Sequence, residues 1–261
     1  MIPAQIKTIW ARRSFKRRPF IGAHTRSIFL VRTHQWNRRA QTLYKTLCKD
    51  VGASQVLVSF DTRINPLPVD VPCQAIDRQW VESMGLCAPE NYGWRCGDYN
   101  WYRALDMPWK SLWLVEPDVR LVNLSYAELD AMFADNDADF IANRVVQAPP
   151  DWTWNERASR LADTIYLSFF PITRIRRSAA EALLVQRRRW STIFRRNGLP
   201  TPEWPNDESF VATVIGNSPT MTYDQLSKRG IDCSLCRYRG VFTQADMDTL
   251  KGPALVHPVR L

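Results

Sequence analysis

Apolar residues gather in short runs that end in polar residues, and these runs predict the strands of a sheet. The first run covers residues 27–33 and the second covers residues 55–61. Between them, residues 34–48 carry apolar side chains at helical spacing, which predicts a helix. A strand, a helix and a second strand form a βαβ unit with parallel strands and a right-handed crossover. The first part of the chain therefore predicts an α/β fold.

A third apolar run, residues 111–115, leads directly into two carboxylates, Glu116 and Asp118, on either side of Pro117. We expect a buried strand with both carboxylates at its carboxyl end, where open α/β sheets bind ligands. In an extended segment, side chains at positions i and i+2 point the same way, so both carboxylates would reach one cation. Oxygen donors of this kind suit Mg²⁺ or Mn²⁺. A solvated turn after the strand is the alternative interpretation of the same pair.

The remaining elements alternate less regularly. We expect further strands at residues 73–77, 139–146 and 164–173, and helices at residues 78–84, 98–105, 125–133, 174–196 and 209–215. Asp98 is a candidate N-cap of its helix. Ser125 and Glu128 have the spacing of a capping box, which marks a helix start.

Composition and length are those of a globular protein. The chain has 261 residues, of which 45% are hydrophobic and 23% are charged. It has no uncharged apolar run of about 18 residues, so we expect no transmembrane helix, and its start lacks the pattern of a secretory signal. Of six cysteines, only Cys233 and Cys236 form a C-x-x-C pair. Reduced thiols in a cytoplasmic protein are favoured over a metal or redox site.

The net charge of +9 is concentrated in two blocks, residues 1–26 and residues 174–196. Basic blocks are typical of proteins that contact nucleic acid, an anionic membrane surface or a phosphorylated ligand. Nucleic acid is the least favoured of these partners, because no helix-turn-helix, zinc-finger or RNP pattern is present. We expect residues 1–26 to form a basic arm. We further expect this arm or the arginine-rich helix to lie on an anionic membrane surface, at the inner membrane face.

The order of the acidic motifs resembles the GT-A fold of nucleotide-sugar glycosyltransferases. Those enzymes have a D-x-D motif after a middle strand, an x-E-D motif that opens a later helix, and often a histidine near the C-terminus. This sequence has Glu116-Pro117-Asp118, then Asn206-Asp207-Glu208 and then His257. The segments 97–102 and 113–120 also resemble a bacterial and fungal branch of such proteins. The sequence departs from the family pattern by Glu for the first Asp, and by Asp-Glu for Glu-Asp.

This resemblance implies a three-layer α/β/α sandwich with a mostly parallel central sheet. It implies one domain over residues 27–261, with a nucleotide-binding half at residues 27–122 and an acceptor-side half at residues 123–261. The implied activity is transfer of a sugar from a nucleotide-sugar donor to a glycan or lipid-linked acceptor. A divalent cation, Mn²⁺ or Mg²⁺, would neutralise the leaving diphosphate. A base that faces the acceptor would give inversion at the anomeric carbon.

The resemblance also assigns the reacting residues. Asp118, Glu116 and His257 are the implied metal ligands. Glu208 is the first candidate for the general base, and Asp207 is the second. Two simpler interpretations stay open: in the first, the acidic pair serves only to start the helix at residue 209, and in the second, His257 is a structural histidine.

The donor nucleotide is implied to contact polar residues around the ends of the first strands. These residues are Arg32, Thr33, Asp61, Asp98 and Glu116. Trp152, Trp154 and Trp204 could stack on sugar rings of an acceptor, or could serve packing alone. Two other functions use the same features: a nucleic-acid-binding protein, and a metal-dependent phosphoesterase that employs the same carboxylates.

Overall fold

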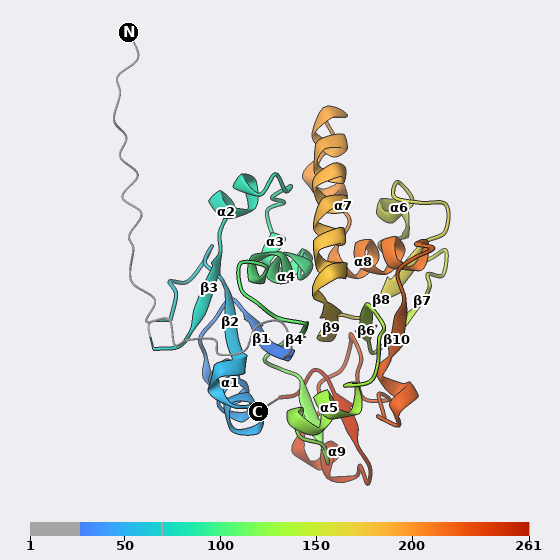
Figure 1. Ribbon diagram of the computed structural model, residues 1–261. Coiled ribbons are helices and arrows are strands. Elements are labelled where there is room, and N and C mark those ends of the chain that lie inside the picture. The colour runs from blue at the N-terminus through green and yellow to red at the C-terminus, as the bar shows by residue number, and fades with distance from the viewer. Residues whose placement is uncertain (1–26, 69, 261) are drawn as a thin grey trace.

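A seven-stranded sheet forms the centre of the computed structural model, which describes residues 27–68 and 70–260 (Figure 1). In spatial order the strands are β10 (Tyr223–Gln225), β6 (Phe140–Ala142), β9 (Ile172–Arg176), β4 (Ser111–Val115), β1 (Ser27–Thr33), β2 (Val56–Asp61) and β3 (Cys73–Ile76). Only β9 runs antiparallel to its neighbours, β4 and β6. The other pairs in the sheet are parallel. The mostly parallel sheet of an α/β fold is therefore confirmed. The basic arm expected at residues 1–26 lies outside the described residues.

Helices cover both faces of this sheet. They are α1 (Arg38–Val51) and α5 (Tyr126–Met132) on one face, and α4 (Asp98–Ala104), α7 (Arg177–Arg196) and α8 (Asp207–Gly216) on the other. Side chains alternate along β1, so Phe29 and Val31 pack with α1 and α5 while Ile28 and Leu30 pack with the other helices. The three layers expected from the sequence are present.

β1 is the strand where the connections of the sheet change direction. It pairs with β2 on one side and with β4 on the other, and both pairings are parallel. The carboxyl ends of these three strands therefore lie at one edge of the sheet, which is where open α/β sheets bind ligands. Arg32, Asp61 and Glu116 stand at or directly beyond these ends.

Short elements complete the fold. They are α2 (Arg78–Ser83), α3 (Tyr92–Arg95), α6 (Asn155–Ala158), α9 (Gln244–Asp248) and single 3₁₀ turns at Ala53–Gln55, Thr201–Glu203 and Leu226–Arg229. Two ladders lie outside the central sheet: β5 (Arg120–Val122) with β11 (Ala254–Val256), and β7 (Val145–Gln147) with β8 (Tyr166–Ser168). Within the described residues, no helix has the length and apolar character to cross a membrane.

Two strand predictions were wrong, because each expected strand is divided in two. The segment 139–146 separates into β6, in the central sheet, and β7, which pairs with β8 instead. The segment 164–173 separates into β8 and β9 on either side of Pro171. Proline has no N–H to donate to a ladder, which interrupts pairing at this point.

Three helix starts also differ from prediction. The arginine-rich helix expected from residue 174 begins at Arg177, because β9 continues through Arg176. The helix expected from residue 34 begins at Arg38, because the Asn37 side chain caps it by accepting from the Ala40 N–H. The helix expected at residue 209 begins at Asp207, where Asn206 is the cap. The capping box expected at Ser125 is present.

Candidate active site

Glu116 and Asp118 lie on a tight turn that follows the buried strand β4. The Val119 N–H donates to the Glu116 carbonyl at 3.1 Å, which closes a β-turn around Pro117. The expectation that an extended segment aligns the two carboxylates was therefore wrong. The turn brings the two side chains together instead.

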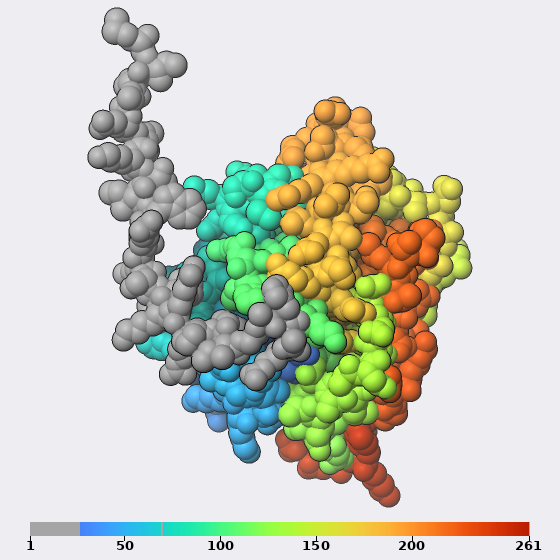
Figure 2. Space-filling view, in the orientation of Figure 1, coloured from blue at the N-terminus to red at the C-terminus, as the bar shows by residue number. Residues whose placement is uncertain are grey.

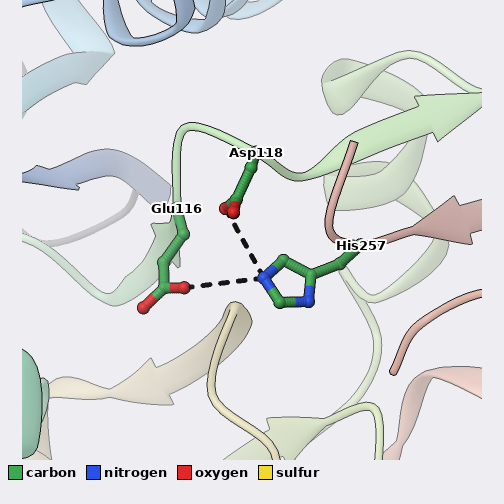
Figure 3. A group of neighbouring side chains, drawn as sticks. All are labelled: Glu116, Asp118 and His257. Atoms are coloured by element: carbon green, nitrogen blue, oxygen red, sulfur yellow. Dashed lines mark ion pairs between the residues drawn. The ribbon is translucent and has the colours of Figure 1, made fainter. Parts of the chain in front are cut away.

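The C-terminal segment places His257 beside this turn. β11 pairs with β5, the strand that follows the turn, and the Val259 N–H donates to the Asp118 carbonyl at 2.9 Å. The His257 Nε2 atom lies 3.5 Å from Asp118 Oδ1 and 3.8 Å from Glu116 Oε2 (Figure 3). The side chains of Glu116, Asp118 and His257 thus lie close together, although His257 is 141 positions after Glu116 (257 − 116).

This group of three has the donor set of a divalent-cation site. One ligand atom from each of Glu116, Asp118 and His257 lies within 4.8 Å of the others. The His257 Nδ1 atom is 3.1 Å from the Arg237 carbonyl, which can only accept, so Nδ1 carries the hydrogen. The Nε2 lone pair then faces the carboxylates, as metal-binding histidines require. Two carboxylates and one imidazole fit Mn²⁺ or Mg²⁺.

The charges in the group of three stabilise one another. Burial lowers the pKa of His257, but Asp118 and Glu116 outweigh this effect, and the net pKa is raised. Burial raises the pKa of Asp118, but the hydrogen bond and the charge of His257 outweigh it, and the net pKa is lowered. Without a cation, His257 therefore tends to hold a proton between the carboxylates, and a cation would have to displace that proton.

Arg32 connects the candidate metal ligands to a second acidic pair. Its Nη1 atom donates to Glu116 Oε1 at 2.9 Å and to Asp207 Oδ2 at 3.3 Å. Its Nη2 atom donates to the carbonyls of Gly93, at 2.9 Å, and Trp94. Burial lowers the pKa of Arg32, but the surrounding carboxylates outweigh this and keep the guanidinium charged. Arg32 therefore holds both acidic groups in place.

Asp207 and Glu208 form that second pair, in the first turn of α8. Asp207 is buried, with Oδ2 accepting from the Gly97 N–H at 2.7 Å and Oδ1 from the Glu208 N–H at 2.9 Å. Glu208 is only half-buried, and its Oε2 accepts from Asn206 Nδ2 at 3.3 Å. Asp207 is thus fixed within the protein, whereas Glu208 has access to solvent.

The two carboxyl groups differ in acidity. Burial raises the pKa of Glu208 to about 8, and the nearby charges of Asp207 and Glu116 add to the rise. Burial also raises the pKa of Asp207, but Arg32 and the two backbone N–H groups oppose that rise. In the absence of a cation, Glu208 therefore holds a proton near neutral pH, while Asp207 is the more acidic of the two.

Thr33 and Asp61 lie at the predicted edge of the sheet but are engaged within the protein. The Thr33 hydroxyl donates to the Gln35 carbonyl at 2.8 Å. Asp61 accepts from the Arg63 N–H at 3.1 Å and from its Nε at 2.9 Å. A Cβ atom on Gly93 would come within 1.8 Å of Asp61 Oδ2, so the chain at Gly93 packs directly on this carboxylate. The contact of Thr33 and Asp61 with the donor nucleotide stays a prediction.

Asp98 lies inside the protein, paired with Arg187. It is fully buried, and it accepts from Arg187 Nε at 2.6 Å, Arg187 Nη2 at 3.1 Å and the Tyr102 hydroxyl at 2.9 Å. It is also the first residue of α4 and makes no cap. The N-cap assignment of Asp98 was therefore wrong. Its carboxylate is engaged in an internal ion pair, and its contact with the donor nucleotide stays a prediction. Arg187 also donates to the Pro205 carbonyl at 3.0 Å, so this pair supports the chain that leads to Asp207.

The arginine-rich helix uses its arginines in two ways. Arg187 is fully buried, whereas Arg188, Arg189 and Arg196 are exposed. Helix α7 lies on the face of the molecule shown in Figure 2, where it is coloured orange. Arg187 belongs by sequence to the basic block at residues 174–196. Its spacing from the buried Leu183 and Phe194 places it on the apolar face of the helix, and this spacing was the signal that could have identified it.

The three tryptophans proposed for stacking are not equivalent. Trp204 is fully buried against Phe194, at 5.1 Å between ring centroids, so it serves packing. Trp152 and Trp154 are half-buried. Trp94 was not singled out in the sequence, although its backbone carbonyl binds Arg32 and its side chain is 55% exposed.

Comparisons with known proteins give distant structural likenesses. No protein-family model and no curated protein matches the chain. Core-mannan synthase A from Aspergillus fumigatus, in its Mn/GDP form, has a TM-score of 0.43 and 9% identity over 74% of this chain and 70% of its own. The mannosyltransferase Ktr4p from S. cerevisiae, in complex with GDP, has a TM-score of 0.37 and 11% identity over 75% and 67%. Both TM-scores are below 0.5, so the likeness to these two structures is remote.

Proposed function

We propose that this protein is a divalent-cation-dependent glycosyltransferase that uses a nucleotide-sugar donor. The observation that carries the proposal is the grouping of Glu116, Asp118 and His257 at the carboxyl edge of a mostly parallel sheet. A second acidic pair is joined to this group through Arg32. Glycosyl transfer requires these two features together: a place for the leaving diphosphate, and a base for the acceptor.

On the donor side, Asp118, Glu116 and His257 would hold Mn²⁺ or Mg²⁺. When bound, the cation supplies Lewis-acid neutralisation of the leaving diphosphate. Arg32 fixes Glu116 through Oε1 and so leaves Oε2 on the His257 side. The Arg237 carbonyl fixes the ring of His257 through Nδ1. The chain therefore preorganises the ligand set before a cation arrives, which is what strong electrostatic stabilisation requires.

On the acceptor side, we assign Glu208 as the general base. Its carboxylate is half-exposed and would take the proton from the acceptor hydroxyl as the new glycosidic bond forms. Asp207 is excluded from this role in our proposal, since Arg32 and two backbone N–H groups occupy its oxygens. A raised pKa suits a base that works near neutral pH. A base on the acceptor side supports inversion.

Product analysis tests the proposal. The protein is incubated with Mn²⁺ and UDP-, GDP- and CMP-sugars, and the released nucleotide and any transferred sugar are measured. We expect metal-dependent release from one donor class, and a loss of transfer of about 10²–10⁴-fold in Glu208→Gln. Release of inorganic phosphate from phosphate esters, or cleavage of nucleic acid, would instead support the phosphoesterase alternative.

The acceptor and the location of the protein stay predictions. A glycan or lipid-linked acceptor fits a cytoplasmic enzyme at the inner membrane face. The exposed arginines of α7 would support contact with an anionic surface. Vesicles that contain anionic lipid should bind the protein at low salt and release it at high salt.

A further inference from the structure

We propose that Trp94, supported by Trp154, forms a platform for a pyranose ring of the acceptor glycan, an inference that rests on the proposed glycosyltransferase function. Their ring centroids lie 6.3 Å apart with an interplanar angle of 47°. Trp94 is 55% exposed and Trp154 is half-buried. Tryptophan is highly buried on average, so an exposed ring that packs against a second one requires an explanation.

The platform borders the candidate site. The backbone of Trp94 accepts a hydrogen bond from Arg32, and the same guanidinium contacts Glu116 and Asp207. Trp154 belongs to the half of the chain that was predicted to face the acceptor. A sugar ring stacked on Trp94 would therefore lie against the segment whose backbone binds Arg32, and Arg32 in turn binds the acidic residues.

The second ring is held in a fixed position. The guanidinium of Arg95 lies 5.0 Å from the centroid of Trp154, and that of Arg157 lies 4.7 Å from it. Arg95 is itself anchored, because it donates to the carbonyls of Thr201 at 3.3 Å and Pro202 at 3.0 Å. The platform is thus preorganised, which reduces the entropy that ligand binding would otherwise cost.

The chemistry of this surface matches a sugar better than a fully apolar ligand. One face of a pyranose presents C–H groups that can pack on an indole ring, and its rim presents hydroxyls. Indole rings supply a large apolar face at low conformational cost. The guanidiniums of Arg95 and Arg157 lie over the Trp154 ring, so Trp94, which is 55% exposed, offers the open aromatic face. An open aromatic face therefore fits the C–H face of a hydroxylated ring.

Binding of the wild-type protein to an array of oligosaccharides tests the platform. Trp94→Ala and Trp154→Ala should lower glycan binding about tenfold, the loss expected from one or two stacking contacts. Trp94→Phe should restore part of the binding, since it keeps an aromatic face. Trp80→Ala is the matched control: it is also half-buried beside a guanidinium, that of Arg103 at 5.6 Å, but lies on α2. It should bind glycans as the wild type does.

The Mn²⁺-dependent stabilisation by nucleotide is measured on the same variants to separate this inference from the proposed function. We expect that stabilisation to be unchanged in Trp94→Ala and Trp154→Ala. If nucleotide stabilises the wild type but no oligosaccharide on the array binds, the platform is wrong and the proposed function stands. Unchanged glycan binding in both variants would also contradict it. A loss of nucleotide stabilisation in the variants would show that the rings stack on the nucleobase instead.

Discussion

Glu208 is the residue whose environment differs most from that of an ordinary surface carboxylate. Burial and two neighbouring carboxylates raise its pKa from 4.5 to about 8. The neighbouring Asp207 accepts hydrogen bonds from the Gly97 N–H and from Arg32. These donors therefore stabilise the charge of Asp207 and not that of Glu208. The two acids therefore have different roles. Asp207 stays charged and organises the site, whereas Glu208 can exchange a proton.

The raised pKa of Glu208 has a consequence for stability. Between about pH 4.5 and 8, the folded protein binds more protons at Glu208 than the unfolded chain does. The free energy of unfolding therefore falls as the pH rises through this window. In the metal-free protein, Glu208→Gln should weaken this fall. Urea unfolding at pH 5, 6.5 and 8 measures it, and parallel pH profiles of variant and wild type would contradict it.

His257 makes a second quantity depend on pH, the affinity of the site for a cation. This affinity should rise with pH, whereas the free energy of unfolding should fall. The pKa of His257 is raised by Asp118 and Glu116 despite burial, so the metal-free site retains a proton as pH rises past the ordinary histidine value of 6.5. Cation binding must release that proton. The affinity for Mn²⁺ should therefore increase as the pH rises through the pKa of His257. Calorimetric titration in two buffers of different ionisation enthalpy should show proton release, and His257→Gln should abolish it.

At the scale of elements, a buried ion pair fixes the position of α8. Arg187 on α7 pairs with Asp98 on α4 and donates to the Pro205 carbonyl, which leads to Asp207. Both side chains have 0% exposure. Removing one partner of such a pair leaves an uncompensated buried charge, which costs about 3–5 kcal/mol.

Arg187→Met and Asp98→Asn should each lower the free energy of unfolding by about that amount, whereas the double variant should lose less than the sum. Arg189→Met, an exposed position on the same helix, is the control and should change it by about 0.5 kcal/mol or less. Urea denaturation measures all four. Single variants that match the control would show that the pair contributes nothing to stability.

The backbone at Gly97, the N-cap position of α4, packs directly against the site. A Cβ atom on Gly97 would lie 2.5 Å from both Arg32 Nη1 and Asp207 Oδ2. Gly97→Ala should therefore displace this ion pair, destabilise the fold by about 1–3 kcal/mol and lower Mn²⁺-dependent nucleotide binding. Gly252→Ala is the control, since its Cβ would meet no atom within 4 Å. Equal stability and binding in the two variants would contradict this packing.

The elements show how far sequence patterns reach. β1 begins and ends where predicted. A strand that is buried on both faces of a parallel sheet is a continuous apolar run, so the run itself marks the ends of the strand. The strand expected at residues 139–146 failed, because alternation does not reveal which partner each half will pair with. The site follows the same division. The order of the acidic motifs pointed to Glu116, Asp118 and His257, and the structure places these three side chains together. The partner of Asp98 is 89 residues away and could not be seen in a local pattern.

At the scale of the whole molecule, the candidate metal site joins distant parts of the chain. The turn after β4 supplies Glu116 and Asp118, and the C-terminal segment supplies His257 through the pairing of β11 with β5. A cation bound there would cross-link the C-terminal segment to the central sheet. Any ligand that binds only the folded state must raise its stability by mass action, so occupancy of the site can be read from unfolding.

The most direct test is thermal unfolding of the wild type and Asp118→Asn with UDP, GDP and CMP, each with and without Mn²⁺. The account predicts that one nucleotide raises Tm only when Mn²⁺ is present, and that Asp118→Asn loses this rise, measured for each variant against its own Tm without ligand. Asp246→Asn, an exposed carboxylate at the start of α9, is the matched control and should keep the rise. An Mn²⁺-independent shift, or the same shift in Asp118→Asn, would contradict a metal-dependent nucleotide site at Glu116, Asp118 and His257.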